Sequence, residues 1–433
     1  MRRPLDEEID RFAGRMLELG LTPSTAVAVT DREGTLYEQS YGGPDLDALW
    51  EIGSISKSFT AVVVLQLAEE GVLDLRVPVT EYLPWFSVKS RYEPITLHHL
   101  LTHTGGLIMG SEIATASTFD VIAVADTETG FAPGEHLWYS NVGYRAIGLL
   151  LEQVTGRSYP DLIQERVLDP LGMRNSTPTI VHETRKRLPP GFLPFYDDRP
   201  WRPEHGFVPA TWIESAEGDG SICCTPADLA TYLRALMRGG EGLLSPESFR
   251  LMTALHTVDD QEGGHYGYGL VTEEAALGHG GGMVGYHAHM WADLAAGVGA
   301  VAFINGATGA QALTGAAIAL AKGAEPEEAS FTPGEPLLDD GSAPPELAGL
   351  LGHYRAHNPW LTNFRIGARA GTLWFGADGV DIERHPLTPL DDRSFRVGAA
   401  PWSPERLRFD TPIDGKAQRA FYSGNPYFRC FTP

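Results

Sequence analysis

The order of apolar and polar positions in the larger, N-terminal part of the chain predicts a mixture of strands and helices. Residues 25–42, TAVAVTDREGTLYEQSYG, alternate around a turn signal, which predicts a β-hairpin. An apolar run from about Ser54 to Glu70 predicts a long helix that Gly71 ends. Residues 297–309, GVGAVAFINGATG, predict a late buried strand. Together with a loop-rich region between Pro78 and Leu137, this mixture indicates an α+β fold with a helical subregion.

A second domain is expected after a proline-rich connection. Residues 324–345 contain five prolines and several acidic side chains but little periodic apolar pattern, so we interpret them as a linker. They divide a first domain, residues 1–323, from a second domain, residues 346–433. The second domain has short apolar runs separated by turn signals, which predict a small antiparallel β-barrel, with a sandwich as the alternative.

One uncharged stretch, residues 294–321, is long enough to be compared with a membrane-spanning helix. Asparagine–glycine and threonine–glycine pairs interrupt its middle, so it predicts a strand, a turn and an alanine-rich helix, and no membrane span. The first residues lack the apolar segment of a secretory signal. The three cysteines, Cys223, Cys224 and Cys430, are too few for a disulfide framework, which favours a cytoplasmic location.

The charge of the chain argues against two classes of partner. The 33 Lys and Arg residues face 56 Asp and Glu residues, which gives a net charge of −23. Nucleic-acid-binding proteins and proteins held on anionic membranes need basic surface, so we expect neither partner. The deficit lies in the first domain and linker, since residues 1–340 carry a net charge of −25 and residues 341–433 one of +2.

Ser54 and Lys57 form a Ser-x-x-Lys motif at the expected start of the long helix. One helical turn separates them, so they share a face, and a desolvated lysine at this point can take the serine proton. The positive helix end favours negative charge that develops beside the serine. Such strings are also common by chance, and the alternative is a serine N-cap followed by a solvent-facing lysine.

Two further segments add candidate site residues. Tyr139 and Asn141 can supply a phenolic proton shuttle and a hydrogen-bond donor for a substrate amide, although a buried tyrosine and a capping asparagine are the alternative. His279 precedes glycines 280–282 at the start of an expected strand, where its ring and a following backbone N–H could lie beside a substrate. These glycines also match a dinucleotide-binding string, but a strand rather than a helix follows them, so we reject that site.

The order and spacing of the three segments resemble those of the serine β-lactamase and penicillin-binding-protein superfamily, in its class C-like branch of esterases and D-aminopeptidases. In that branch the motifs are Ser-x-x-Lys, Tyr-x-Asn, and Lys-Thr-Gly or His-x-Gly. The resemblance covers about residues 8–320 and implies an antiparallel sheet flanked by helices, plus a helical subregion. The expected C-terminal barrel resembles the lipocalin-like module that some peptidases of this branch carry.

This resemblance also implies roles for individual residues. Ser54 attacks a carbonyl and forms an acyl-enzyme, while Lys57 and Tyr139 move its proton. The backbone N–H groups of Ser54 and Gly282 form the oxyanion hole. The residues that the resemblance assigns to substrate binding are Asn141 and His279. It implies no metal and no organic cofactor.

Three functions stay open at this stage. The first is a serine hydrolase or acyltransferase that acts on a peptide, ester or thioester carbonyl, of the esterase or D-stereospecific peptidase type. The second is a penicillin-binding-protein-type thioesterase that releases and macrocyclises a nonribosomal peptide, with a carrier-linked or thioester peptide as its substrate. The third is a catalytically silent protein that senses a peptide. A small peptide or ester is the expected partner, and the oligomeric state is left open.

Two other groups of residues are candidates for a binding site. His98, His99 and His103 form H-H-x-x-x-H, but no glutamate follows His99, so we interpret them as a helix end leading into a loop and not as a metal site. Basic residues of the second domain could lie over the acidic first domain and help to hold a substrate carboxylate, although a solvated or interdomain ion pair is the commoner role of such residues. These residues are Arg408, Arg419 and Arg429.

Overall fold

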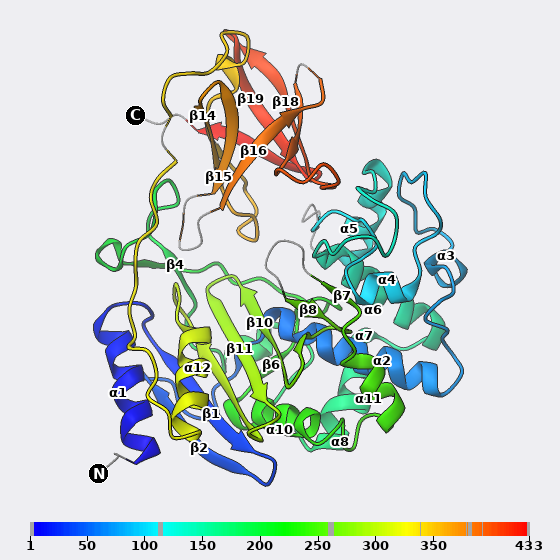
Figure 1. The fold of residues 1–433 in the computed structure, drawn as a ribbon, viewed down its shortest axis with the longest axis vertical. Helices are drawn as coiled ribbons and strands as arrows, with labels where there is room; N and C mark the ends of the chain where they lie inside the picture. Colours follow the sequence, from blue (N-terminus) through cyan, green and yellow to red (C-terminus); the bar gives the residue numbers. More distant parts are fainter. Residues whose placement is uncertain are drawn as a thin grey trace.

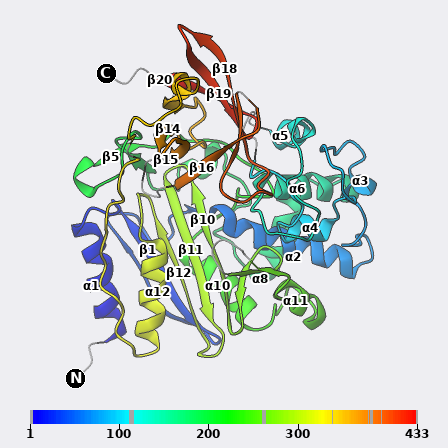
Figure 2. The ribbon, with the colours of Figure 1, turned by 45° about the horizontal axis from the view of Figure 1, so that its top comes forward.

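The computed structural model describes most of the chain as a body, which runs from α1 to α12, followed by a C-terminal barrel (Figure 1). The described residues are 4–110, 116–258, 264–337, 339–377, 379, 383–391 and 393–430. Figures 1 and 2 both place the barrel at one end of the body, on the side away from α8 and α10.

An antiparallel sheet forms the centre of the body (Figure 1). Its described strands lie in the order β2-β1-β12-β11-β10-β9-β8-β7. The predicted hairpin of residues 25–42 is confirmed as β1 and β2, and the predicted late strand is confirmed as β12, which pairs with β1 and β11. The strand bounds are β1 Thr25–Asp31, β2 Thr35–Tyr41, β7 Thr257–Val258, β8 His265–Tyr266, β9 Val271–Glu273, β10 Ala276–Met283, β11 Tyr286–Asp293 and β12 Val298–Ile304.

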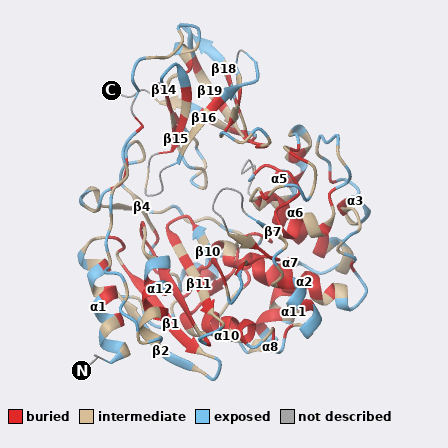
Figure 3. Ribbon diagram, in the orientation of Figure 1, coloured by how far each residue is buried: buried red, intermediate tan, exposed pale blue. Residues whose placement is uncertain are grey.

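Helices cover both faces of this sheet because its central strands are apolar on both sides. In β1, Val27 faces a core that α1 and α12 close, whereas Ala28 faces a larger core that contains α2, α6 and α10. Buried residues accordingly follow the sheet and these helices (Figure 3). The main helices are α1 Leu5–Glu18, α2 Ser56–Glu69, α6 Asn141–Thr155, α10 Pro226–Met237 and α12 Ala310–Ala321.

The uncharged stretch at residues 294–321 is divided between β12 and α12, as its pattern predicts. Among the helices in the described ranges, none combines the length and apolar character needed to cross a membrane.

Short elements make up the helical subregion and the loops around the sheet. The short helices are α3 Val79–Tyr82, α4 Leu97–Leu101, α5 Ser117–Ala123, α7 Tyr159–Ile163, α8 Asp169–Leu171, α9 His182–Arg185 and α11 Pro246–Met252. The short strands of the body are β3 Trp50–Glu51, β4 Phe192–Pro194, β5 Phe207–Pro209 and β6 Cys223–Cys224. β3 pairs with β6, which places both cysteines in the buried core.

The long helix starts two residues later than its pattern predicts. A 3-10 turn, η1 at Gly53–Ile55, comes first, and α2 then runs from Ser56 to Glu69. Residues are buried around nearly the whole circumference of α2, which is typical of a helix inside a large core. This helix therefore carries Lys57 into the interior of the body.

The C-terminal barrel is a closed, antiparallel ring in which β13 pairs with β20, so the predicted small antiparallel barrel is confirmed. Aromatic side chains fill its interior, so it is a packed core. These side chains include Tyr354, Phe364, Phe375, Phe395, Phe409 and Tyr427. The strands are β13 Gly352–Arg355, β14 Phe364–Arg369, β15 Thr372–Ala377, β16 Glu383–Pro389, β17 Ser394–Val397, β18 Arg406–Ile413, β19 Lys416–Tyr422 and β20 Asn425–Cys430.

A buried contact joins the barrel to the helical subregion. The Trp402 ring stacks on His136, with 4.2 Å between centroids. Glu405 accepts hydrogen bonds from the backbone N–H of Met109 at 2.8 Å and from Trp138 Nε1 at 3.0 Å. Burial raises the pKa of the Glu405 carboxyl. These contacts fix the barrel against the part of the body that carries Tyr139.

A second contact lies on the other side of the barrel. Asp197, near β4, accepts hydrogen bonds from Arg355 Nε and Asn363 Nδ2, both at 2.8 Å. The connection between body and barrel forms no helix or strand at residues 324–337 and 339–345. Its Phe331 packs edge-on against Trp201, with 5.0 Å between centroids.

Candidate active site

Ser54 lies in a turn that packs directly against β10. A Cβ atom on Gly53, whose φ is +50°, would lie 2.7 Å from the backbone nitrogen of Gly282. A Cβ atom on Gly281 would lie 1.9 Å from the carbonyl oxygen of Ile52. Only glycine allows this approach of two backbones, which brings Gly282 next to the turn of Ser54. The pairing of their N–H groups as an oxyanion hole stays a prediction.

Lys57 is fully buried, and three oxygen atoms lie within hydrogen-bond distance of its side-chain nitrogen. Lys57 Nζ lies 2.9 Å from Ser54 Oγ, 2.8 Å from Asn141 Oδ1 and 2.9 Å from the backbone oxygen of Asp219. Ser54 makes no helix-capping hydrogen bond. The alternative of a serine cap and a solvent-facing lysine is therefore wrong, and the two side chains are close enough for direct proton transfer.

Tyr139 covers the lysine with its ring. The ring centroid lies 4.9 Å from Lys57 Nζ, and a second ring, that of Tyr144, lies 5.6 Å from it. Burial raises the pKa of the Tyr139 hydroxyl, and the nearby Ser54 side chain offsets part of that rise. Within the described ranges this buried hydroxyl has no hydrogen-bond partner, so it is available to a group that enters the site.

Asn141 is the first residue of α6, and its side chain bonds to Lys57. The alternative of a capping asparagine is wrong, because Ser140 caps this helix: its Oγ accepts from the backbone N–H of Gly143 at 3.1 Å. The backbone N–H of Asn141 donates to the Met109 oxygen at 2.6 Å, which fixes the start of the helix.

His279 lies on the face of β10 that is turned toward the Tyr139 ring, with 6.2 Å between centroids. Its Nε2 is 2.8 Å from the Tyr266 hydroxyl, and its Nδ1 contacts the oxygen of Gly280. Burial, with a smaller contribution from Lys57, lowers the pKa of His279 to about 4. His279 is thus a neutral, hydrogen-bonded imidazole near neutral pH, and its contact with substrate stays a prediction.

A second buried histidine, His103, supports Tyr139 and was not among the predicted site residues. Its ring lies 4.1 Å from the Tyr139 ring between centroids, and its Nδ1 accepts from the backbone N–H of Ser140 at 3.0 Å. Its φ is +57°, which a turn after α4 imposes. Burial, with the charge of Lys57, lowers the pKa of His103. The H-H-x-x-x-H string in the sequence drew attention to His103 but did not indicate its contact with Tyr139.

Arg145 forms a buried ion cluster behind the lysine. It is one turn after Asn141 on α6, and it pairs with Asp120 at 2.5 Å, Glu217 at 2.9 Å and Asp219 at 3.3 Å. Asp219 is also the residue whose backbone oxygen accepts from Lys57. This cluster therefore ties the lysine's environment to α5 and α6, and no motif in the sequence indicated it.

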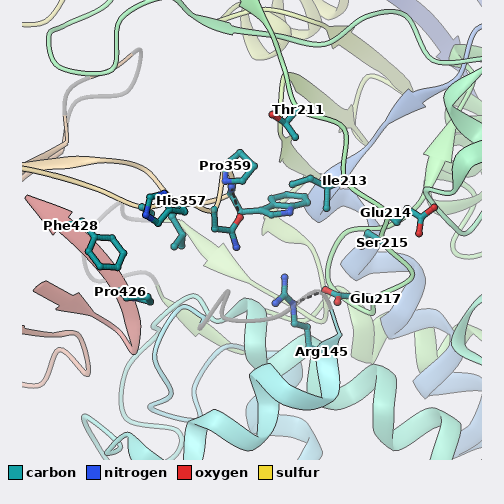
Figure 4. Close-up of a pocket in the computed structure, with 14 residues that line it drawn as sticks. Arg145, Thr211, Ile213, Glu214, Ser215, Glu217, His357, Pro359, Pro426 and Phe428 are labelled. Carbon is teal, nitrogen blue, oxygen red and sulfur yellow. Dashed lines mark hydrogen bonds and ion pairs between the residues drawn. The ribbon is translucent and has the colours of Figure 1, made fainter. Parts of the chain in front are cut away.

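A cavity of about 480 Å³ opens between body and barrel beside this cluster. Arg145, paired with Glu217, lies on the body side, and Phe428 and Pro426 of β20 face it from the barrel (Figure 4). Trp360 and neighbouring residues of the β13–β14 loop complete a largely apolar wall. The space beside the Arg145 cluster is thus built from both domains.

The competing candidates take structural roles. His99 caps α4 by accepting the backbone N–H of Thr96 at its Nδ1, and His98 Nδ1 contacts the Tyr268 hydroxyl. Across the part of the chain that the structure describes, no group of three or more His, Cys, Asp or Glu side chains is arranged to hold a metal ion.

The expectation that C-terminal arginines hold substrate is wrong for two of them. Arg429 donates to the backbone oxygens of Ala417, Leu351 and Gly349 within the barrel. Arg419 pairs with Asp410 at 2.8 Å.

The fold is an antiparallel sheet between two helical layers. In the site, a buried lysine is hydrogen-bonded to a serine in a turn that packs against β10. These two features define the class of penicillin-recognising serine proteins. The comparison with protein families agrees with this class. The β-lactamase family model matches residues 9–325, so the chain belongs to that family, whose members are acyl-transferring serine hydrolases.

Individual relatives share 28–30% sequence identity with parts of this chain. Penicillin-binding protein 4* of Bacillus subtilis is 28% identical over 300 residues, which are 59% of this chain and 62% of that protein. Protein flp of Staphylococcus aureus is 30% identical over 188 residues, which are 40% of this chain and 38% of that protein. The chain therefore matches less than two thirds of the length of either relative.

Solved structures agree with the fold. The octameric penicillin-binding protein homologue of Pyrococcus abyssi has a TM-score of 0.64 at 22% identity and covers 99% of this chain and 100% of its own. A D-stereospecific amidohydrolase from Streptomyces has a TM-score of 0.59 at 25% identity and covers 69% of this chain and 94% of its own. The first similarity extends over both domains, whereas the second covers about as much of the chain as the body alone.

Proposed function

We propose that this protein hydrolyses small amides, peptides or esters through an acyl-enzyme at Ser54, with a preference for D-configured residues. The observation that carries the proposal is the 2.9 Å contact between Ser54 Oγ and the buried Lys57 Nζ. The names of two similar solved proteins, the D-stereospecific amidohydrolase from Streptomyces and a D-amino acid amidase from Ochrobactrum anthropi, support the substrate class.

The reaction runs in two halves. Lys57, in its neutral form, takes the Ser54 proton as Oγ bonds to the substrate carbonyl carbon, and the carbonyl oxygen gains the negative charge. The N–H groups of Ser54 and Gly282 stabilise this oxyanion. Collapse breaks the bond to the leaving amine or alcohol, which takes a proton through Tyr139. Water then attacks the ester of Ser54, and the same groups return the proton to Oγ.

The surroundings of the lysine fit this scheme. The Tyr139 hydroxyl has no partner among the described residues, so it is free to pass a proton to the leaving group. The Asn141 side chain, held at Lys57, has its amide nitrogen left over to meet a substrate carbonyl. Because His279 is neutral, it places no positive charge near Lys57. A charged imidazole at this position would repel the positive charge that Lys57 gains when it takes the serine proton.

A panel of D- and L-amino acid amides, p-nitrophenyl esters and a chromogenic β-lactam tests the proposal. We expect turnover of esters and D-amides, and its loss in Ser54→Ala. Ser87→Ala, which changes an exposed serine, is the control and should retain full activity. Equal turnover by wild-type protein and Ser54→Ala would contradict the proposal.

An amine acceptor is the second candidate, and it would make the protein a peptide cyclase of the thioesterase type. The cavity of about 480 Å³ between the domains, beside the Arg145 cluster, favours it, because a space of this size suits a peptide chain that folds back on its own ester. Incubation with linear peptide thioesters, followed by mass analysis, separates the two fates. Cyclic product supports this candidate, and hydrolysed product alone rejects it.

A further inference from the structure

Glu51 is a buried carboxyl that the reaction at Ser54 does not use. It is the second residue of β3, three positions before the nucleophile, and only 5% of its surface is exposed. Its carboxylate forms no hydrogen bond or ion pair with any residue in the described ranges. Since a buried carboxyl normally has partners, this one is left for a group from outside the chain.

The Glu51 side chain lines a separate cavity of about 280 Å³. Its wall is apolar and polar in nearly equal parts, and most of it comes from the Leu188–Gly191 and Pro209–Ile213 segments. Tyr286 and Trp360 add aromatic surface. The cavity is smaller than the usual site for a whole drug-sized ligand, so it fits one chain or side group of a larger molecule.

Two residues of the Glu51 cavity are close in sequence to residues of the reaction site. Glu51 precedes Ser54 by three positions, and Val284 is two residues beyond Gly282 on the same stretch of chain. The cavity also shares Thr211, Ile213 and Trp360 with the larger cavity between the domains. Chain segments that flank Ser54 and Gly282 therefore contribute to the Glu51 cavity.

The charged and titratable groups around Glu51 have a simple pattern. Burial raises the pKa of Glu51 itself to about 8. Burial also raises the pKa of Cys223 on β6 and of Tyr286 on β11, so both stay uncharged near neutral pH. Arg185, an exposed residue, also lines the cavity, and its guanidinium lies 5.5 Å from the Trp212 ring centroid. Burial is nevertheless the cause of the raised Glu51 pKa, and no cation among the described residues opposes it.

We propose that the Glu51 cavity is a binding subsite for an aliphatic primary ammonium group, with Glu51 as its counter-ion. Prolines and aromatic rings suit the methylene stem of such a group, and the carboxylate at the end suits its charge. The net charge of −25 on residues 1–340 attracts cationic molecules to this part of the protein. For the proposed hydrolase, this subsite selects substrates with a lysine-like or ornithine-like side chain.

Binding at this subsite is linked to proton release. The ammonium group needs the ionised carboxylate, but near pH 7 most Glu51 is protonated in the free protein, so binding expels that proton to solvent. Affinity therefore rises with pH, by about tenfold for each unit below the pKa of Glu51, and levels off above it. Arg185 stays charged throughout and cannot produce this dependence.

Calorimetric titration of the Ser54→Ala protein with n-hexylamine tests the proposal, with n-hexanol as the uncharged match. The test measures binding and not turnover, so its result is independent of the proposed hydrolysis. We expect hexylammonium to bind about ten- to a hundredfold more tightly than hexanol at pH 8.5, as a charge-assisted contact should. We also expect proton release near pH 7, seen as heats that differ between buffers.

Glu51→Gln keeps the shape of the side chain and removes its charge. It should bind hexanol as before, lose the advantage of hexylammonium and release no protons. Glu214→Gln, which removes an exposed carboxylate at the neighbouring cavity, is the matched control and should retain the advantage. Equal binding of amine and alcohol by the parent protein, or unchanged amine binding by Glu51→Gln, would overturn the proposal.

Discussion

The buried ion cluster behind Lys57 makes a strong prediction about stability. The Arg145 side chain is 7% exposed, and the Asp120 side chain, which pairs with it at 2.5 Å, is fully buried. Replacing Arg145 by methionine removes the cation and leaves Asp120 as a buried carboxylate without that neutralising charge. Breaking a buried pair from one side costs about 3–5 kcal/mol, far more than the intact pair contributes.

We therefore expect Arg145→Met to lower the free energy of unfolding by about 3–5 kcal/mol. Adding Asp120→Asn to this variant should recover at least about 1 kcal/mol, because the buried carboxylate that lost its arginine is then replaced by a neutral amide. Arg157→Met is the control, since Arg157 and Glu165 form an exposed pair with side chains 46% and 51% accessible, worth at most about 1 kcal/mol.

Urea unfolding followed by tryptophan fluorescence measures these differences. The first unfolding transition is compared among variants, because a two-domain chain need not unfold in one step. A loss below about 1 kcal/mol for Arg145→Met, or no recovery on adding Asp120→Asn, would refute the reasoning that the cluster is a coupled buried unit.

Three further predictions follow from single contacts. Tyr139→Phe should lower kcat by about 10²–10⁴-fold in ester hydrolysis while leaving the melting temperature nearly unchanged, since it removes an unpartnered hydroxyl; an unchanged kcat would exclude that hydroxyl from proton transfer. Gly281→Ala should destabilise the fold and abolish turnover because its Cβ would lie 1.9 Å from the Ile52 oxygen, and thermal melting with an activity assay measures both. Glu405→Gln should stabilise the protein at pH 8 but not at pH 4 in urea unfolding. Burial raises the pKa of Glu405 in the folded protein, so the native protein loses stability as pH rises above the pKa that this carboxyl has in the unfolded chain. A difference in unfolding free energy between the two proteins that does not change with pH would contradict this.

The sequence could indicate candidate residues where the signal lies within one chain segment, and their catalytic and binding roles stay predictions. Ser54 and Lys57 are one turn apart, and glycines 280–282 indicate a close backbone approach, so both features are visible without tertiary structure. The hairpin, the late strand and the barrel were also predictable, since period-2 patterns and turn residues are local signals.

Other parts of the site could not be predicted because they depend on contacts between distant segments. His103 reaches Tyr139 only through the fold, and Arg145 meets Asp120 and Asp219 from three separate elements. The start of the long helix was placed at Ser54 because η1 and α2 share one apolar pattern. The mistaken interpretation of the C-terminal arginines had a similar origin: net charge does not show that Arg429 is directed at carbonyl groups inside its own barrel.

The central claim is that Ser54 becomes acylated with the help of Lys57. Intact-mass analysis after treatment with a fluorophosphonate tests it most directly, followed by peptide mapping of the adduct. The account predicts one adduct per chain, on the peptide that contains Ser54, no adduct in Ser54→Ala, and strongly slowed labelling in Lys57→Met. An adduct that persists in Ser54→Ala, or that maps to another residue, would contradict the account.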